Sequence, residues 1–154
     1  MAEHKIQLEW IKGDAAFTYD TYSRNHQITF KDGVAKTFSA AAVYRGDPSK
    51  GDPEDLFVAA LSSCHMLSFL AIAARKRITV LSYDDDASGW LENEGGKLWM
   101  TRVVLRPKIV FESTPDAATV GQMHIMAHEQ CFIANSVKTD GKVGVIAAPP
   151  SHRS

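Results

Sequence analysis

Hydrophobic and polar positions alternate in several short stretches of the chain and recur at helical spacing in two longer ones. The apolar residues Ile6, Leu8 and Trp10 follow the period of a half-buried strand. Similar patterns, separated by clusters of glycine, aspartate and other turn formers, predict strands at residues 17–22, 27–30, 34–43, 78–83, 87–92, 98–111 and 142–147. The short turns between neighbouring strands favour antiparallel hairpins at the start of the chain and at residues 87–111.

A long helix is predicted to follow the loop at residues 45–52. Asp52 is expected to cap its N-terminus and Pro53 to take the first helical position, where a missing N–H costs nothing. Apolar residues then recur every three or four positions, and the cations at residues 75–77 suit its C-terminal end. The helix is apolar around much of its circumference, so we expect it to be central.

A second helix is predicted from Thr114, Pro115 and Asp116 through about Gln130, ending near Cys131. The order of strands, helix, strands, helix and strand is typical of an α+β fold, because the strands cluster and do not alternate with helices. A length of 154 residues fits one domain over residues 1–154, with a loose tail from about residue 148.

Composition and charge exclude several classes of protein. Hydrophobic residues make up 45% and charged residues 23%, as in ordinary soluble proteins, and the net charge of -1 leaves no basic surplus for nucleic acid. Polar residues such as Ser62 and His65 interrupt the long helix, so no apolar run approaches the ~20 residues of a membrane span. The N-terminal residues lack the apolar region of a secretion signal, which predicts a reducing, cytoplasmic location.

The chain has only two cysteines, Cys64 and Cys131. Such a pair is compatible with two buried hydrophobic residues, one structural disulfide, half a metal site or two reactive thiols. A persistent structural disulfide is disfavoured in a reducing compartment, so a pair that reacts there is expected to be catalytic or redox-sensing.

The positions of the two cysteines predict unequal roles. Cys64 lies on the apolar face of the long helix. A cation is needed nearby to stabilise its thiolate, and the folded chain is expected to supply it from Arg24 or Arg45. Cys131 lies at the negative end of its helix dipole, close to Glu129, which disfavours a thiolate. Cys64 is therefore expected to attack first, and Cys131 to attack a sulfenic acid formed on Cys64.

Other motifs give weaker signals. His124 and His128 are four residues apart on one helix, three residues before Cys131, which is a possible zinc arrangement. The chain has no CxxC or HExxH motif to support it, nor any phosphate-binding or serine-hydrolase motif, so we expect no metal and no cofactor. The acidic run at residues 84–86 is interpreted as a solvated turn.

Two segments of the chain resemble the cysteine motifs of the OsmC/Ohr family, the osmotically inducible and organic hydroperoxide resistance proteins. The first is Asp-Pro-Glu-Asp-Leu-Phe-Val-Ala-Ala-Leu-Ser-Ser-Cys, which ends at Cys64. The second is Ala-His-Glu-Gln-Cys, which ends at Cys131 and is followed by Asn135. The order of strands and helices also agrees with this family over nearly the whole chain.

The resemblance implies the OsmC-like fold, in which antiparallel sheets pack on two main helices, one long and central, in an intertwined homodimer. It implies a thiol-dependent peroxidase of the oxidative stress response that reduces organic hydroperoxides without metal or flavin. Cys64 would be the peroxidatic residue and Cys131 would resolve it as a disulfide. A lipoyl-type or thioredoxin-type dithiol would then act as reductant.

The resemblance also assigns a glutamate ten residues before the first cysteine, paired with an arginine from an early strand or loop. The glutamate is Glu54, and Arg24 is the expected arginine, with Arg45 as the alternative. Ten residues of straight helix separate Glu54 from Cys64 by about 15 Å. Either the helix breaks between them or Glu54 serves the site of a second chain, and we predict the second arrangement.

The sequence thus predicts that Arg24, oriented by Glu54, lowers the pKa of Cys64 and binds the hydroperoxide. The apolar residues Phe57, Leu61, Phe132 and Ile133 are candidates for a pocket, and equally for ordinary core. The alternative function is a non-enzymatic redox sensor or a small-ligand binding protein on the same scaffold, which would be oxidised without turnover.

Overall fold

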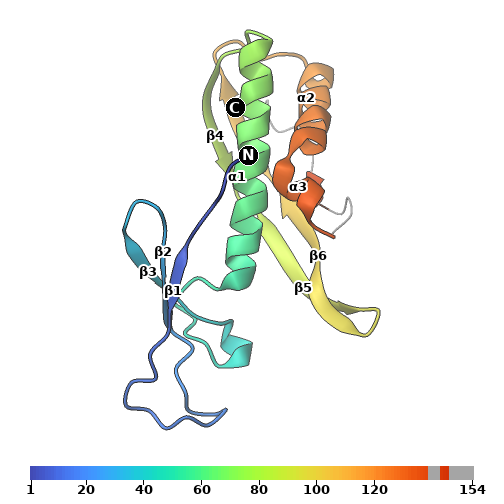
Figure 1. The fold of residues 1–154 in the computed structure, drawn as a ribbon. Helices are drawn as coiled ribbons and strands as arrows, with labels where there is room; N and C mark the ends of the chain where they lie inside the picture. Colours follow the sequence, from blue (N-terminus) through green and yellow to red (C-terminus); the bar gives the residue numbers. More distant parts are fainter. Residues whose placement is uncertain (139–142, 146–154) are drawn as a thin grey trace. The chain divides into compact units, whose positions relative to one another are not determined.

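The computed structural model describes residues 1–138 and 143–145, which fall into two compact units (Figure 1). The N-terminal unit comprises residues 1–56, and the C-terminal unit begins at Phe57. The boundary lies within the first turns of the longest helix. The predicted loose tail from residue 148, and the outer residues of the strand predicted at 142–147, lie outside the described residues.

The N-terminal unit contains a three-stranded antiparallel sheet in the order β1 (Gln7–Glu9), β2 (His26–Thr29) and β3 (Ala35–Phe38). These strands confirm three of the predicted ones: β1 and β3 are shorter than predicted, and β2 begins and ends one residue earlier. A 3-10 turn at Ala42–Tyr44 replaces the end of the third predicted strand. The strand predicted at residues 17–22 is wrong. The alternating aromatic residues there form a turn, and the rings of Phe17 and Tyr22 pack edge-on or tilted against Trp10 and each other.

The long helix α1 (Pro53–Arg75) begins where the sequence predicts. The Asp52 carboxylate accepts a hydrogen bond from the Asp55 N–H at 2.8 Å, and the Asp55 carboxylate accepts one from the Asp52 N–H at 3.1 Å. These reciprocal bonds satisfy two backbone donors that a helix start leaves without an intrahelical partner.

Two groups of strands support the C-terminal unit. β4 (Val80–Asp85) pairs antiparallel with β7 (Pro107–Phe111), and β5 (Ser88–Glu94) forms a hairpin with β6 (Lys97–Leu105). β8 (Val143–Val145) pairs parallel with β6. The yellow β5–β6 hairpin is conspicuous in Figure 1 because it extends well beyond the helices of this unit.

A single strand was expected at residues 98–111, but the chain breaks at Arg106 between β6 and β7. The Arg106 N–H donates to the Asp85 carboxylate at 2.7 Å, and the Ser62 hydroxyl donates to the other oxygen of the same carboxylate. The interpretation of residues 84–86 as a solvated turn is therefore wrong for Asp85, which ends β4 and ties it to α1.

The second main helix, α2 (Ala117–Gln130), ends where the sequence predicts but begins later. Asp116, and not Thr114, caps it, because the Asp116 carboxylate accepts a hydrogen bond from the Thr119 N–H at 2.8 Å. A short helix that the sequence did not predict, α3 (Phe132–Ser136), follows directly, with Cys131 between the two helices.

The core of the C-terminal unit consists of two clusters on α1. The larger joins the C-terminal half of α1 to α2 and β7, and its buried members are Phe69, Ile72, Ala73, Ile109, Phe111, Val120, Met123 and Ala127. The smaller joins Leu61 to Val103 and Leu105 of β6. At Gly89 of β5 an added Cβ would lie 2.6 Å from the Val58 side chain, so glycine allows this close approach to α1.

Among the described residues, one stripe of α1 is exposed, and we refer to it as the uncovered stripe. By length and composition α1 is apolar enough to cross a membrane, despite the polar interruptions that led us to expect no such run, and 28% of its most apolar window is buried. A core helix of a soluble protein meets the same criterion. The uncovered stripe contains Ala59, Ser63, Leu67 and Ala74, and Leu67 is 59% exposed.

Candidate active site

The two thiols lie together in the C-terminal unit, both reduced. Cys64 comes from the middle of α1 and is partly exposed, whereas Cys131 joins α2 to α3 and is only 2% exposed. The Cys64 side chain contributes to the raised pKa of Cys131, so the two side chains are neighbours. The structure thus brings together two cysteines that are 67 positions apart in the sequence.

Burial disfavours the thiolate form of Cys131. It raises the pKa of the Cys131 thiol to about 11, and the neighbouring Cys64 adds to this rise. The Ala134 N–H opposes it by donating to Cys131 Sγ at 3.3 Å, which makes the sulfur the N-cap of α3. The expected direction is therefore confirmed, but the main cause is desolvation, whereas the sequence suggested the helix dipole and Glu129.

Most of the apolar residues proposed to form a pocket beside the cysteines pack in the core instead. Leu61 is fully buried one turn before Cys64, and Phe57 and Ile133 pack against the same cluster. Phe132 is 79% exposed and does not join them. Of the four residues proposed as a pocket, three are therefore core residues in this chain.

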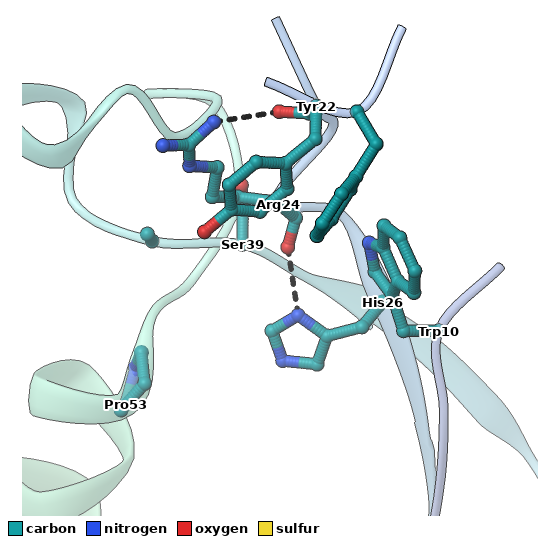
Figure 2. Close-up of a pocket in the computed structure, with 8 residues that line it drawn as sticks. Trp10, Tyr22, Arg24, His26, Ser39 and Pro53 are labelled. Carbon is teal, nitrogen blue, oxygen red and sulfur yellow. Dashed lines mark hydrogen bonds between the residues drawn. The ribbon is translucent and has the colours of Figure 1, made fainter. Parts of the chain in front are cut away.

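Arg24 belongs to the N-terminal unit, where it lines an open pocket of about 450 Å³ (Figure 2). Three aromatic side chains form much of its wall. The lining residues are Trp10, Phe17, Tyr22, Arg24, His26, Ser39, Ala40 and Pro53. A mainly apolar pocket with a few polar groups is the usual form of a small-molecule site.

Backbone carbonyls and tyrosine rings hold the Arg24 guanidinium. It donates to the Tyr22 carbonyl oxygen and to the Tyr19 carbonyl oxygen, each at 2.7 Å, and lies 3.6 Å from the centre of the Tyr22 ring (Figure 2). His26 Nδ1 is bonded to the Arg24 carbonyl oxygen at 2.8 Å. Arg24 is therefore fixed in place without a carboxylate partner among these contacts.

The alternative arginine, Arg45, is differently engaged. Its guanidinium forms an ion pair with Asp20 at 2.9 Å and lies 5.5 Å from the centre of the Tyr19 ring, on which Arg24 also stacks. Arg45 does not line the pocket that contains Arg24. A surface ion pair of this kind contributes little stability, but it leaves the Arg45 guanidinium already paired with a carboxylate.

Glu54 lies in the first turn of α1, next to Pro53, which lines the Arg24 pocket. No ion pair of Glu54 with Arg24 is present in the part of the chain that the structure describes. Because α1 is unbroken from Pro53 to Arg75, the alternative of a helix break before Cys64 is excluded. Glu54 and the Cys64 of its own chain therefore stay about 15 Å apart.

A buried histidine pair was missed by the sequence reasoning. His65 Nε2 of α1 lies 3.0 Å from His124 Nδ1 of α2, and the two rings are parallel to within 5°. Burial lowers the pKa of His65 to about 3 and that of His124 to about 4, and the charges of His124 and His128 lower the first further. The His124–His128 spacing was visible, but the partner that uses His124 is 59 positions away in the sequence.

The possible zinc arrangement at His124 and His128 is not assembled. Within residues 1–138 and 143–145, no group of three or more potential ligand side chains is gathered for a metal ion. His124 instead bonds to His65, and the remaining ring nitrogen of His124 is buried without a hydrogen-bond partner in this part of the chain.

Comparison with known proteins identifies the family and the fold. The sequence model of the OsmC-like protein family matches residues 46–145. The chain belongs to the OsmC-like protein family. An OsmC-like protein of unknown function from Vibrio cholerae is 46% identical, with a TM-score of 0.86 over 95% of this chain and 100% of that one. No functionally curated protein matches the chain.

More distant members of the family share the fold. An organic hydroperoxide resistance protein OsmC from Legionella pneumophila is 19% identical, with a TM-score of 0.66 over 94% of this chain and 96% of that one. The organic hydroperoxide resistance protein OhrB of Bacillus subtilis is 20% identical, with a TM-score of 0.60 over 94% and 95%. The predicted α+β, OsmC-like fold is confirmed.

Proposed function

We propose that this chain is a cysteine-dependent peroxidase that reduces organic hydroperoxides to alcohols. The observation that carries the proposal is the pair of neighbouring reduced thiols, one partly exposed and one buried with a raised pKa. Family members named as organic hydroperoxide resistance proteins share the fold and support the same chemistry. We place this activity in the cytoplasm, as a defence against oxidative stress.

In the first step the Cys64 thiolate attacks the distal oxygen of the hydroperoxide. The O–O bond breaks, the sulfur becomes a sulfenic acid, and the alkoxide takes up a proton and leaves as an alcohol. Cys64 suits this step because it is the more exposed of the two sulfurs. A nearby guanidinium would stabilise both the thiolate and the charge that develops on the leaving oxygen.

In the second step Cys131 attacks the sulfenic acid of Cys64. A disulfide forms, and the hydroxyl group leaves as water with the thiol proton of Cys131. The raised pKa of Cys131 suits this order, because the residue stays protonated and unreactive towards peroxide until its neighbour is oxidised. An external dithiol, of lipoyl or thioredoxin type, then reduces the disulfide and is itself oxidised.

We assign the activating cation to Arg24 and its orientation to Glu54, both supplied to Cys64 by a second copy of the chain. The unbroken α1 keeps Glu54 away from the Cys64 of its own chain. The uncovered stripe around Leu67 runs beside Cys64 on the same helix and is apolar enough to pack against a second α1. A homodimer would then complete each active site from two chains.

The pocket around Arg24 supports a substrate with an apolar organic group. Its wall of Trp10, Phe17 and Tyr22 offers aromatic surface next to the guanidinium. Hydrogen peroxide has no such group to bury, so an organic hydroperoxide gains binding free energy that hydrogen peroxide does not.

The same pocket also favours the alternative function, a small-ligand binding protein or redox sensor. Such a protein would bind a ligand or become oxidised once, without turnover. The two functions differ in whether oxidised Cys64 is regenerated while peroxide and dithiol are both consumed.

Consumption of cumene hydroperoxide in the presence of a dithiol tests the proposal. Wild type should consume many equivalents per chain, and Cys64→Ser should consume none above the uncatalysed rate, because the hydroxyl is not ionised near neutral pH. Wild-type oxidation that stops at one equivalent with dithiol in excess would support the sensor, and full turnover by Cys64→Ser would refute the assignment of the nucleophile.

A further inference from the structure

The contact between α1 and α2 is mostly apolar, with one polar exception. Phe69, Ile72 and Ala73 of α1 pack with Val120, Met123 and Ala127 of α2. In the described part of the chain, the bond from His65 to His124 is the one side-chain hydrogen bond between these helices. Its two side chains are only 2% and 6% exposed.

This bond lies next to the thiols along both helices. His65 directly follows Cys64 on α1, and His124 lies two turns before Cys131, which ends α2. A shift of one helix along the other would therefore move both the histidine pair and the sulfur pair together.

Apolar contacts alone do not fix such a shift. Their free energy depends on the area removed from water and has no preferred direction. A hydrogen bond weakens steeply when its length or angle changes, so a buried one fixes the axial position of the helices. A disulfide also needs its two Cβ atoms within about 3.5–4.5 Å, which a slip of one helical residue would not allow.

We propose that His65 and His124 are positioning residues that hold Cys64 opposite Cys131, so that the disulfide forms readily. This inference rests on the cysteine pair of the proposed function, but it concerns disulfide formation alone. Neither histidine needs to touch the hydroperoxide.

The surroundings of the pair favour its neutral form, in which the N–H of one ring donates to the unprotonated nitrogen of the other. His128 of α2 is close enough to His65 to lower its pKa. Phe69 contacts both His124 and Tyr83 of β4, and Cys64 directly precedes His65. No carboxylate forms a hydrogen bond with either histidine in the described residues. An imidazolium would thus lack a compensating negative charge.

Equilibrium with glutathione measures the inference without any peroxide. Oxidised glutathione takes two electrons from the protein dithiol and yields two molecules of reduced glutathione, while the Cys64–Cys131 disulfide forms. The fraction oxidised at several glutathione ratios, read after an acid quench, gives the effective concentration of one thiol near the other.

Two double variants separate the hydrogen bond from packing. His65→Leu with His124→Leu removes both polar partners and leaves no buried polar atom at the bond, so folding should persist. His65→Gln with His124→Asn places amide groups where the bonded ring nitrogens were and restores a hydrogen bond. Ile72→Val loosens the same interface without touching the bond and serves as the matched control.

We expect the leucine pair to lower the effective concentration about tenfold, the loss of one hydrogen bond of typical strength. In the Gln/Asn pair and in Ile72→Val, the effective concentration should stay within about twofold of wild type, because both keep a hydrogen bond between the helices. A leucine pair equal to wild type, or a Gln/Asn pair as weak as the leucine pair, would overturn the inference. Should the leucine pair not fold, the double variant His65→Met with His124→Met, whose flexible side chains fill the same space without a hydrogen bond, takes its place under the same criteria.

The wild-type result also separates this inference from the proposed function. If wild type forms no Cys64–Cys131 disulfide at any ratio, the resolving step fails, and the positioning role fails with it. If wild type forms the disulfide and the variants do not differ from it, only the positioning role is lost.

Discussion

The two units of the chain hold their functional side chains in contrasting surroundings. In the C-terminal unit, Cys131, His65 and His124 are buried among packed helices and sheet, and burial dominates their pKa values. In the N-terminal unit, Arg24 lies in an open pocket lined by the exposed Phe17 and by the less exposed Trp10 and Tyr22. The two thiols are thus packed within the C-terminal unit, whereas Arg24 lines an open pocket of the N-terminal unit.

This contrast indicates which features of the site tolerate change. A buried group depends on its neighbours for solvation, so a substitution there alters folding and reactivity together. An exposed pocket with few buried atoms allows substitutions that change activity alone. The following predictions test this difference, beginning with the largest effect.

Cys131→Ser should abolish steady-state turnover while leaving the first reaction intact. Without the resolving thiol the sulfenic acid on Cys64 persists, because the dithiol has no Cys64–Cys131 disulfide to reduce. Stopped-flow consumption of cumene hydroperoxide should show one equivalent, and a sulfenic-acid reagent should label the product. Sustained turnover in this variant would mean that the dithiol resolves Cys64 directly.

Arg24→Ala should lower the second-order rate constant with hydroperoxide by about 100-fold, the range seen when one preorganised donor is removed. Any loss of stability should be small, because the contacts of Arg24 are with carbonyl oxygens and rings of the nearby Tyr19 and Tyr22, and a urea titration of the same variant measures it. Arg45→Ala is the matched control, since Arg45 also stacks on Tyr19 but pairs with Asp20 outside the pocket. A larger loss in the control would transfer the role to Arg45.

Mixing two inactive chains tests whether the site is shared. Arg24→Ala and Cys64→Ser, refolded together, should regain about a quarter of wild-type activity, because half of the dimers are mixed and each has one intact site. Activity that stays at the level of the separate variants would show that Arg24 and Cys64 act within one chain.

Leu67→Glu should dissociate the proposed homodimer and lower the proposed peroxidase activity with it. The charge would lie in the uncovered apolar stripe of α1, where a second helix would have to bury it. Leu98→Glu is the control, since Leu98 is 55% exposed on β6, close to the 59% of Leu67. Sedimentation velocity measures the mass, and equal behaviour of the two variants would exclude this stripe as the interface.

Stability should decrease as the pH falls below about 6.5, because both buried histidines have lowered pKa values in the folded state. The unfolded chain then binds more protons than the folded one, so the free energy of unfolding is greatest above this pH and declines towards pH 4. The variant with His65→Gln and His124→Asn should lose this part of the decline in urea titrations. An unchanged pH profile would mean that the pair takes up protons over the same pH range in the folded and unfolded states.

Local sequence signals predicted the elements that local physics determines. Asp52 and Pro53 mark the start of α1 correctly because capping depends on neighbouring residues. The break at Arg106 was not predictable, since the Asp85 carboxylate that bonds its N–H comes from another strand. Residues 17–22 alternate like a strand, yet their rings pack around Trp10 and Arg24 instead.

In the candidate site too, the sequence predicted what depends on local residues and missed what depends on distant ones. The motifs identified Cys64 and Cys131, and the structure brings these two together. His65 was overlooked because its partner, His124, is reached only through the packing of α2 on α1. The pairing of Arg24 with Glu54 stays a prediction, since it depends on contacts beyond one chain.

The position of Cys131 at the start of α3 also has an electrochemical consequence. Its sulfur accepts the Ala134 N–H and so stabilises the dithiol form of the protein. If the disulfide draws that sulfur towards Cys64, the cap is lost, at a cost of up to about 1 kcal/mol. For a two-electron couple this raises the reduction potential by about 20 mV. The N-cap of α3 would then favour reduction of the Cys64–Cys131 disulfide to the dithiol.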